Sequence, residues 1–129
     1  MKAFIKQKLR EGISASEAYR DEHAIQTVID GKRDLGFISL IGSTVSEEQF
    51  WNIIKQSGLK TIKVPSNKFN AFIYFRNGAE NKAKELLDIA EKYEGFLAHN
   101  ATPEDTRRIG QLLNYNESDI EDFIKTKYK

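Results

Sequence analysis

The segment KFNAFIYF, residues 68–75, decides the fold of this chain. It begins with a lysine and carries aromatic side chains at Phe69, Phe72, Tyr74 and Phe75, in a run of high β-propensity. Two interpretations follow. The segment is a central strand with both faces buried in a core, or it presents one face of aromatic rings on which nucleic-acid bases stack.

Strands and helices alternate around this segment. The expected elements are a strand at 36–42, a helix from Thr44 to Gly58, a strand at 60–64, the strand at 69–75, a helix from Asn77 to Gly95 and a strand at 96–99. The pairs Thr44 with Glu47 and Asn77 with Glu80 have the spacing of capping boxes. The order βαββαβ over residues 36–99 predicts an α+β, ferredoxin-like fold, an antiparallel sheet with two helices on one face.

Helical extensions are predicted at both ends of this unit. Residues 1–35 contain two amphipathic helices, the second ending at Gly31, and residues 100–129 contain two more. The first of the latter begins at Thr102 and Pro103, an N-cap followed by a proline at N1. With no repeat or linker in the sequence, one domain over residues 1–129 is expected. The open face of the sheet is the expected place for the apolar sides of the terminal helices.

Composition excludes several classes of function. Among 129 residues there are 20 Lys and Arg against 19 Asp and Glu, so no overall charge attracts nucleic acid or an anionic membrane. The absence of cysteine excludes disulfides, thiolate catalysis and cysteine-ligated zinc. No apolar run has the length of a membrane span, and the charged N-terminal segment lacks the apolar stretch of a signal peptide. A cytoplasmic protein is therefore expected.

The predicted third strand resembles the octamer of RNA-recognition-motif domains, K/R-G-F/Y-G/A-F-V-x-F/Y. KFNAFIYF agrees with that octamer at Lys68, Ala71, Phe72 and Phe75. It departs from it at Phe69, where the family has glycine, and at Asn70, where the family has an aromatic residue. GFISLI on the first strand would supply Phe37 as the companion aromatic. The resemblance covers about half of the chain and implies binding of single-stranded RNA.

This hypothesis specifies a binding face. Alternation along the strand places Lys68, Asn70, Phe72 and Tyr74 on one face of the sheet, and Phe37 and Lys63 on neighbouring strands would join them. The aromatic rings would stack on bases, and the lysines would contact phosphates. If helices cover this face instead, the same aromatic residues belong to the core.

Signatures of catalysis are weak. The stretch from Gly36 to Ser43 lacks the lysine of a phosphate-binding loop, and neither His23 nor His99 begins a His-x-Thr/Ser motif. The sequence predicts no cofactor and no metal site. A shallow catalytic cleft near Gly42–Thr44 and His99 is the remaining enzymatic hypothesis.

The hypothesis that follows is a non-enzymatic protein-binding or regulatory module. Its partner is expected to be another protein or a second copy of the chain, with single-stranded RNA as the alternative and no role for a membrane. The opening MKAFIKQKLREG and the run TPEDTRRIGQLLNYNESDIEDFI resemble in style small bacteriophage-encoded proteins. This resemblance extends the hypothesis to an inhibitor of a host system.

Overall fold

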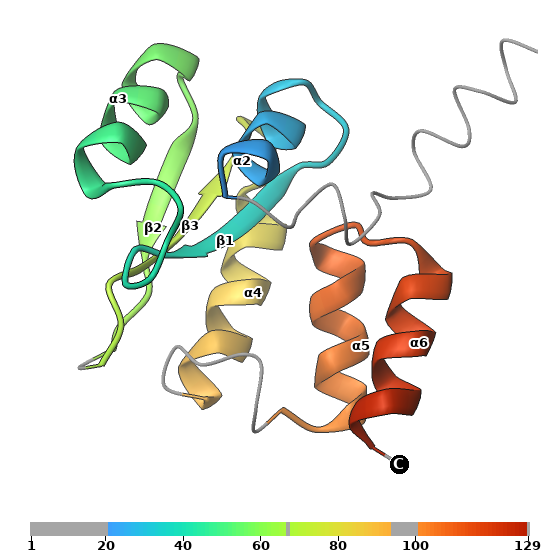
Figure 1. The fold of residues 1–129 in the computed structure, drawn as a ribbon. Coiled ribbons are helices and arrows are strands. Elements are labelled where there is room, and N and C mark those ends of the chain that lie inside the picture. The colour runs from blue at the N-terminus through green and yellow to red at the C-terminus, as the bar shows by residue number, and fades with distance from the viewer. Residues whose placement is uncertain (1–20, 67, 94–100, 129) are drawn as a thin grey trace, which may run out of the picture.

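The computed structural model describes residues 21–66, 68–93 and 101–128. Within these ranges, five helices surround a three-stranded antiparallel sheet (Figure 1), which confirms the α+β class. The elements are α2 (Asp21–Ile29), β1 (Leu35–Ser39), α3 (Glu47–Ser57), β2 (Lys60–Lys63), β3 (Ala71–Phe75), α4 (Glu80–Lys92), α5 (Pro103–Leu112) and α6 (Glu117–Lys127). The predicted helix near the N-terminus and the predicted strand at 96–99 lie outside the described residues.

The strands are arranged in the order β1-β3-β2, with β3 in the centre. Phe37 of β1 lies opposite Ile73 of β3, and Lys63 of β2 lies opposite Phe72. Because residues opposite one another point to the same face, Phe37 shares its face with Ile73 and not with Phe72. The sequence placed Phe37 beside Phe72 and Tyr74, and this placement was wrong. The error arose because alternation within a strand does not determine its register against a neighbour.

Each face of the sheet is covered by its own helices (Figure 1). On one face, Leu35, Ala71, Ile73 and Phe75 pack with α4 and α5, and α6 packs in turn on α5. On the other face, Ile38, Phe72 and Tyr74 pack with α2 and α3. The helical residues that bury against this second face include Ile25, Val28, Phe50 and Ile54.

The prediction of a complete ferredoxin-like fold is therefore wrong. That fold requires both crossover helices on one face, whereas α3 and α4 cover opposite faces here. All five residues of β3, Ala71–Phe75, are buried, so both faces need a covering layer, and contacts between residues far apart in the chain decide which helix supplies each layer. A strand that is apolar on both sides is stable only with a helical layer on each side.

The ends of the helices show which of the predicted caps form. Gly58 ends α3 in the left-handed conformation with φ 73°, and the Thr102 side chain caps α5 as predicted. The capping box of α3, however, is formed by Ser46 and Gln49. Thr44 is engaged elsewhere, because its Oγ1 accepts the backbone N–H of Asp21 at 3.1 Å, at the start of α2.

Candidate protein-contact surface

Trp51, the only tryptophan of the chain, lies on α3 and keeps 38% of its surface exposed. Its neighbour Phe50 is fully buried against the sheet. The Trp51 ring lies edge-on to Phe72, with 5.0 Å between ring centres and an angle of 82°. This edge-to-face arrangement is the one that aromatic quadrupoles favour. A large aromatic side chain is thus fixed at the surface by a ring of the core.

Lys63 extends from β2 to the same place. Its Nζ lies 4.7 Å from the centre of the Phe72 ring and donates a hydrogen bond of 2.8 Å to Asn70 Oδ1. The ammonium group is therefore attracted by the face of an aromatic ring and held by a side-chain amide. Trp51, Lys63, Asn70 and Phe72 form one connected cluster at the edge of the sheet.

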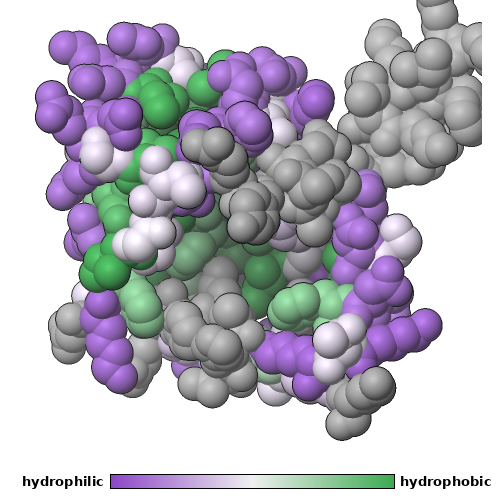
Figure 2. All heavy atoms as spheres, viewed as in Figure 1, coloured by the Kyte–Doolittle hydropathy of each residue, from purple (hydrophilic) through white to green (hydrophobic). Residues whose placement is uncertain are grey.

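The loop after β1 extends this cluster. The backbone N–H of Leu40 donates to the carbonyl oxygen of Asn70 at 2.9 Å, and the next residue, Ile41, is 63% exposed. We call the six residues Leu40, Ile41, Trp51, Lys63, Asn70 and Phe72 the Trp51 surface. Figure 2 shows hydrophobic side chains reaching the exterior on the side of α3 and of the loop that precedes it, with hydrophilic residues around them. Apolar groups with a polar border are typical of sites of protein contact.

The residues predicted to bind RNA are only partly brought together. Lys63, Asn70 and Phe72 belong to the Trp51 surface, and Lys68 lies exposed in the loop before β3. Phe37 is partly buried on the opposite face of the sheet. Phe72 and Tyr74 are only 7% and 1% exposed. A base could reach the face of either ring only if α3 were displaced.

Tyr74 is bonded within the core. Its hydroxyl accepts a hydrogen bond of 3.2 Å from Arg33 Nη2. Burial raises the pKa of Tyr74 to about 12, although the positive charge of Arg33 acts to lower it. The phenol is therefore a neutral group of the interior, and its role is to pack and to accept the Arg33 hydrogen bond.

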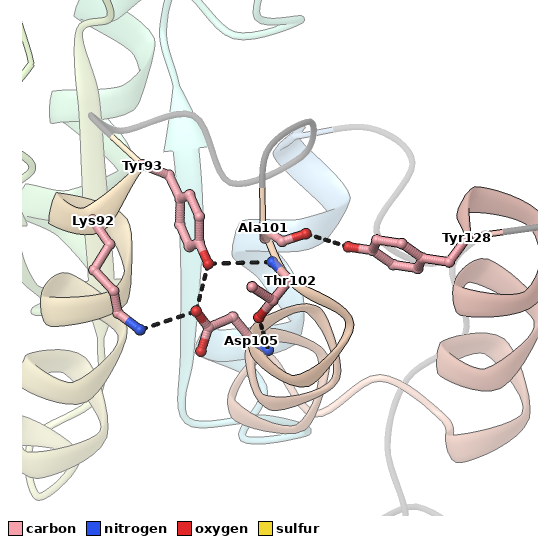
Figure 3. A network of polar contacts seen from close by, with 6 residues as sticks. All are labelled: Lys92, Tyr93, Ala101, Thr102, Asp105 and Tyr128. Atoms are coloured by element: carbon pink, nitrogen blue, oxygen red, sulfur yellow. Dashed lines mark hydrogen bonds and ion pairs between the residues drawn. The ribbon is translucent and has the colours of Figure 1, made fainter.

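A second polar cluster joins the end of α4 to the start of α5 (Figure 3). The Tyr93 hydroxyl donates to Asp105 Oδ2 at 2.5 Å and accepts the Thr102 N–H at 3.2 Å, while Lys92 pairs with the same carboxylate at 3.0 Å. The hydrogen bond from Tyr93, and then the one from Lys92, hold the pKa of Asp105 below its ordinary value. These bonds tie two helices together.

Tyr128, the residue that ends α6, also makes hydrogen bonds to this region. The Tyr128 hydroxyl donates to the carbonyl oxygen of Ala101 and lies 2.7 Å from Thr106 Oγ1. The polar atoms in this cluster are thus directed at one another and at the first turn of α5. We infer that the role of this cluster is structural: it attaches the α5–α6 pair to the end of α4.

At the position suggested for a catalytic cleft, the hydroxyl groups of Ser43 and Thr44 already make hydrogen bonds. Ser43 Oγ donates to Asp21 Oδ2 at 2.5 Å, and Thr44 Oγ1 donates to Glu22 Oε2 at 2.7 Å. These bonds attach the loop to the start of α2. His99 lies outside the described residues. Over residues 21–66, 68–93 and 101–128, no three His, Cys, Asp or Glu side chains gather as a metal site, and no helix has the length and apolar character of a membrane span.

Sequence reasoning missed Trp51. The helix predicted from Thr44 to Gly58 has its apolar stripe at Phe50, Ile53 and Ile54, and this spacing gives Trp51 no role. A signal was available, because the only tryptophan of the chain stands next to that stripe, among charged and polar residues. Large aromatic residues in such positions are enriched in protein interfaces.

Comparison with known proteins adds no relative. No protein-family model, no curated protein and no solved structure matches the chain. The resemblance to RNA-recognition-motif domains therefore stays a prediction.

Proposed function

We propose that this chain is a non-enzymatic protein-binding module and that the Trp51 surface is its contact site. The observation that carries the proposal is the packing of Trp51, 38% exposed and fixed edge-on against Phe72 beside the Lys63 ammonium group. Tryptophan contributes more binding energy in protein interfaces than most side chains do.

The arrangement also reduces the cost of binding. A side chain that is already held in one position loses little conformational freedom when a partner covers it. Phe50 and Phe72 hold Trp51 in this way, each with 5.0 Å between ring centres. The hydrogen bond from Lys63 to Asn70 likewise holds the Lys63 side chain in one position. The surface therefore needs little rearrangement to receive a partner.

Charge favours a protein over RNA as the ligand. The chain carries 20 basic and 19 acidic residues, and phosphate contacts made by basic residues supply most of the affinity for nucleic acid. The rings that would stack on bases are those of Phe72 and Tyr74, which α3 covers. Binding of RNA is the alternative function, and the experiment below can detect it.

The test compares two substitutions of exposed aromatic residues. Trp51→Glu places a charge in the Trp51 surface, and Phe123→Glu places the same charge on α6, where Phe123 is 50% exposed. Tagged parent and variant proteins are used to capture partners from the lysate of the native host, with and without ribonuclease. Circular dichroism of each variant shows whether it retains the fold.

The proposal predicts that at least one captured protein, including an untagged copy of the chain itself, is lost with Trp51→Glu and retained with Phe123→Glu. This binding should resist ribonuclease. If folded Trp51→Glu captures every protein that the parent captures, the Trp51 surface is not the contact site. Capture of RNA that depends on Lys63 and Lys68 would favour the alternative function instead.

A further inference from the structure

We infer that the partner binds as an extended peptide strand, which pairs antiparallel with the free edge of β2 and carries a carboxylate opposite Lys63. This inference deepens the proposed function, on which it rests, because it names the form and the charge of the partner. It follows from the backbone groups at one margin of the sheet and from the lysine beside them.

β2 forms one margin of the sheet, because the strand order is β1-β3-β2 (Figure 1). Three of the five residues of β1, at the opposite margin, are buried. All four residues of β2 are exposed or partly exposed. A strand edge that is open to solvent can accept one more strand, and main-chain hydrogen bonds then supply much of the affinity.

Hydrogen bonds within the sheet show which backbone groups of β2 point outward. The Val64 N–H donates to the Ala71 carbonyl oxygen at 2.9 Å. Residues that bond to the neighbouring strand alternate along an antiparallel ladder, so Ile62 also directs its N–H and carbonyl groups at β3. The N–H and carbonyl groups of Thr61 and Lys63 therefore point away from the sheet. In the part of the chain that the structure describes, no hydrogen bond reaches these outward groups.

The charges at this edge select an acidic strand. Lys60 is already paired with Glu80 of α4 at 3.2 Å. Lys63 gives one of its three N–H donors to Asn70, and no carboxylate among the described residues lies within ion-pair distance of it. A carboxylate opposite Lys63 on an added strand would receive the remaining donors. Cross-strand pairs of opposite charge stabilise a sheet.

The same charges disfavour a second copy of the chain at this edge. Pairing of β2 with the β2 of another copy would bring two further lysines to an edge that already carries Lys60 and Lys63. Lysines on edge strands protect proteins against edge-to-edge association for this reason. A strand that carries carboxylates is attracted where another β2 is repelled.

The two faces of the sheet determine the pattern of the added strand. Its residue opposite Lys63 lies on the face where Trp51 packs on Phe72, because residues opposite one another share a face. Its next residue lies on the other face, beside Ile62, which packs on the core there. A strand in which acidic and apolar residues alternate fits both faces, with its acidic residues on the Lys63 side.

The test uses the full-length protein and two synthetic peptides with capped ends. One peptide alternates valine with glutamate, and its matched control has lysine in place of each glutamate. NMR of the labelled protein measures binding and the rate at which each backbone amide proton exchanges with solvent. The glutamate peptide should slow exchange at Thr61 and Lys63 about tenfold or more, because both N–H groups gain an acceptor. The lysine peptide should bind about tenfold more weakly or worse.

Methylation of the peptide backbone tests the hydrogen bonds directly. In the inferred arrangement the glutamates lie opposite Thr61 and Lys63 and direct their N–H groups at β2, whereas the valines direct theirs at solvent. N-methylation of the glutamates should therefore abolish binding. N-methylation of the valines should leave most of it.

Variants of the protein make the same comparison from the other side. Lys63→Glu should weaken binding of the glutamate peptide about tenfold or more and favour the lysine peptide instead. Thr61→Pro removes an N–H that points outward, a change that edge strands tolerate, and should also weaken binding about tenfold. Thr61→Val keeps this N–H and should leave binding unchanged. If Thr61→Pro does not fold, the methylated peptides still test the same hydrogen bonds.

The outcomes separate this inference from the proposed function. A glutamate peptide that does not bind, or that binds without slowing amide exchange at Thr61 and Lys63, overturns the inference. Binding that survives N-methylation of the glutamates overturns it as well. If the inference fails and Trp51→Glu still abolishes capture of a protein, the proposed function stands with another mode of contact. If Trp51→Glu also changes no capture, both proposals fail.

Discussion

Arg33 and Tyr74 meet in the interior, where Arg33 Nη2 donates a hydrogen bond of 3.2 Å to the Tyr74 hydroxyl. Arg33 is only 4% exposed. Its other acceptors are neutral: Thr27 Oγ1 at 2.8 Å, the Ala24 carbonyl at 3.0 Å and the Leu113 carbonyl at 3.3 Å. No carboxylate pairs with Arg33 within the described ranges. One guanidinium group therefore joins α2, β3 and the segment after α5.

The first prediction concerns this guanidinium group. Arg33→Ala leaves the Thr27 and Tyr74 hydroxyls and the Leu113 carbonyl without their donor, and it opens a cavity. Unpaired buried polar groups and cavities each destabilise, so the free energy of unfolding should fall by about 3 kcal/mol or more. Urea denaturation followed by circular dichroism measures the change.

Arg76→Ala is the matched control. Arg76 is exposed, and the hydrogen bond that its side chain makes to the Val28 carbonyl is 3.3 Å long. Its replacement should change the free energy of unfolding by no more than about 0.5 kcal/mol. Equal effects of the two substitutions would contradict the role assigned to Arg33.

The second prediction concerns the approach of Tyr74 to β1. A Cβ added at Gly36 would lie 2.3 Å from both Cζ and Oη of Tyr74. Gly36→Ala must therefore displace a fully buried ring, and an overpacked core of this kind should cost about 3 kcal/mol of stability. Thermal and urea denaturation both test this.

Ser39→Ala, in the same strand, is the comparison. Ser39 Oγ is buried without a hydrogen-bond partner in the described part of the chain. Removal of an unpaired hydroxyl should leave stability unchanged or slightly raised. If Gly36→Ala is as harmless as Ser39→Ala, Tyr74 does not occupy the position that the structure gives it.

The third prediction is that ionisation of Tyr74 lowers the free energy of unfolding at alkaline pH. Burial raises the pKa of Tyr74 from 10.0 to about 12. Below the lower value the phenol is neutral in both the folded and the unfolded chain, so its contribution is fully present. As pH rises from the unfolded pKa to the folded one, only the unfolded chain ionises. Linkage then removes about 2 kcal/mol of stability by the upper end of this window.

The measurement compares the parent with Tyr74→Phe. The difference in free energy of unfolding between the two should be greatest near about pH 8 and should shrink near about pH 11, because phenylalanine does not ionise. Tyrosinate absorbance of the parent should show one group that titrates only as the chain unfolds. A difference between the two proteins that is constant with pH would contradict the burial of Tyr74.

Local signals in the sequence predicted some helix ends and missed others. The predicted capping box of Asn77 with Glu80 does not form, because α4 begins at Glu80 with Ala79 as its N-cap and no side-chain cap bond. The helix boundary at Gly58, the Thr102–Pro103 start of α5 and the apolar character of β3 were all confirmed. Each depends on a few neighbouring residues, such as a glycine that adopts positive φ or a hydroxyl that bonds an N–H three residues later. The capping of α3 by Ser46 was missed, because Thr44 is engaged by the start of α2, which lies 23 residues away in sequence.

The candidate site was predicted in part. Lys63, Asn70 and Phe72 do lie together, since Lys63 stands opposite Phe72 and its Nζ donates to Asn70 Oδ1, whereas their binding of RNA stays a prediction. Phe37 was grouped with them wrongly, because the register of β1 against β3 is not encoded near Phe37. Trp51 could not be assigned to the group without knowing which face of the sheet α3 covers.

The sequence by itself determined the order of the described helices and strands and the apolar character of β3 on both sides, because those properties follow from short-range periodicity and hydrophobicity. Only the tertiary structure decided that α3 and α4 lie on opposite faces, which leaves Phe72 under Trp51 and Lys63 at the surface. The choice of face depends on contacts between residues far apart in the chain. Sequence periodicity is the same whichever face a helix covers.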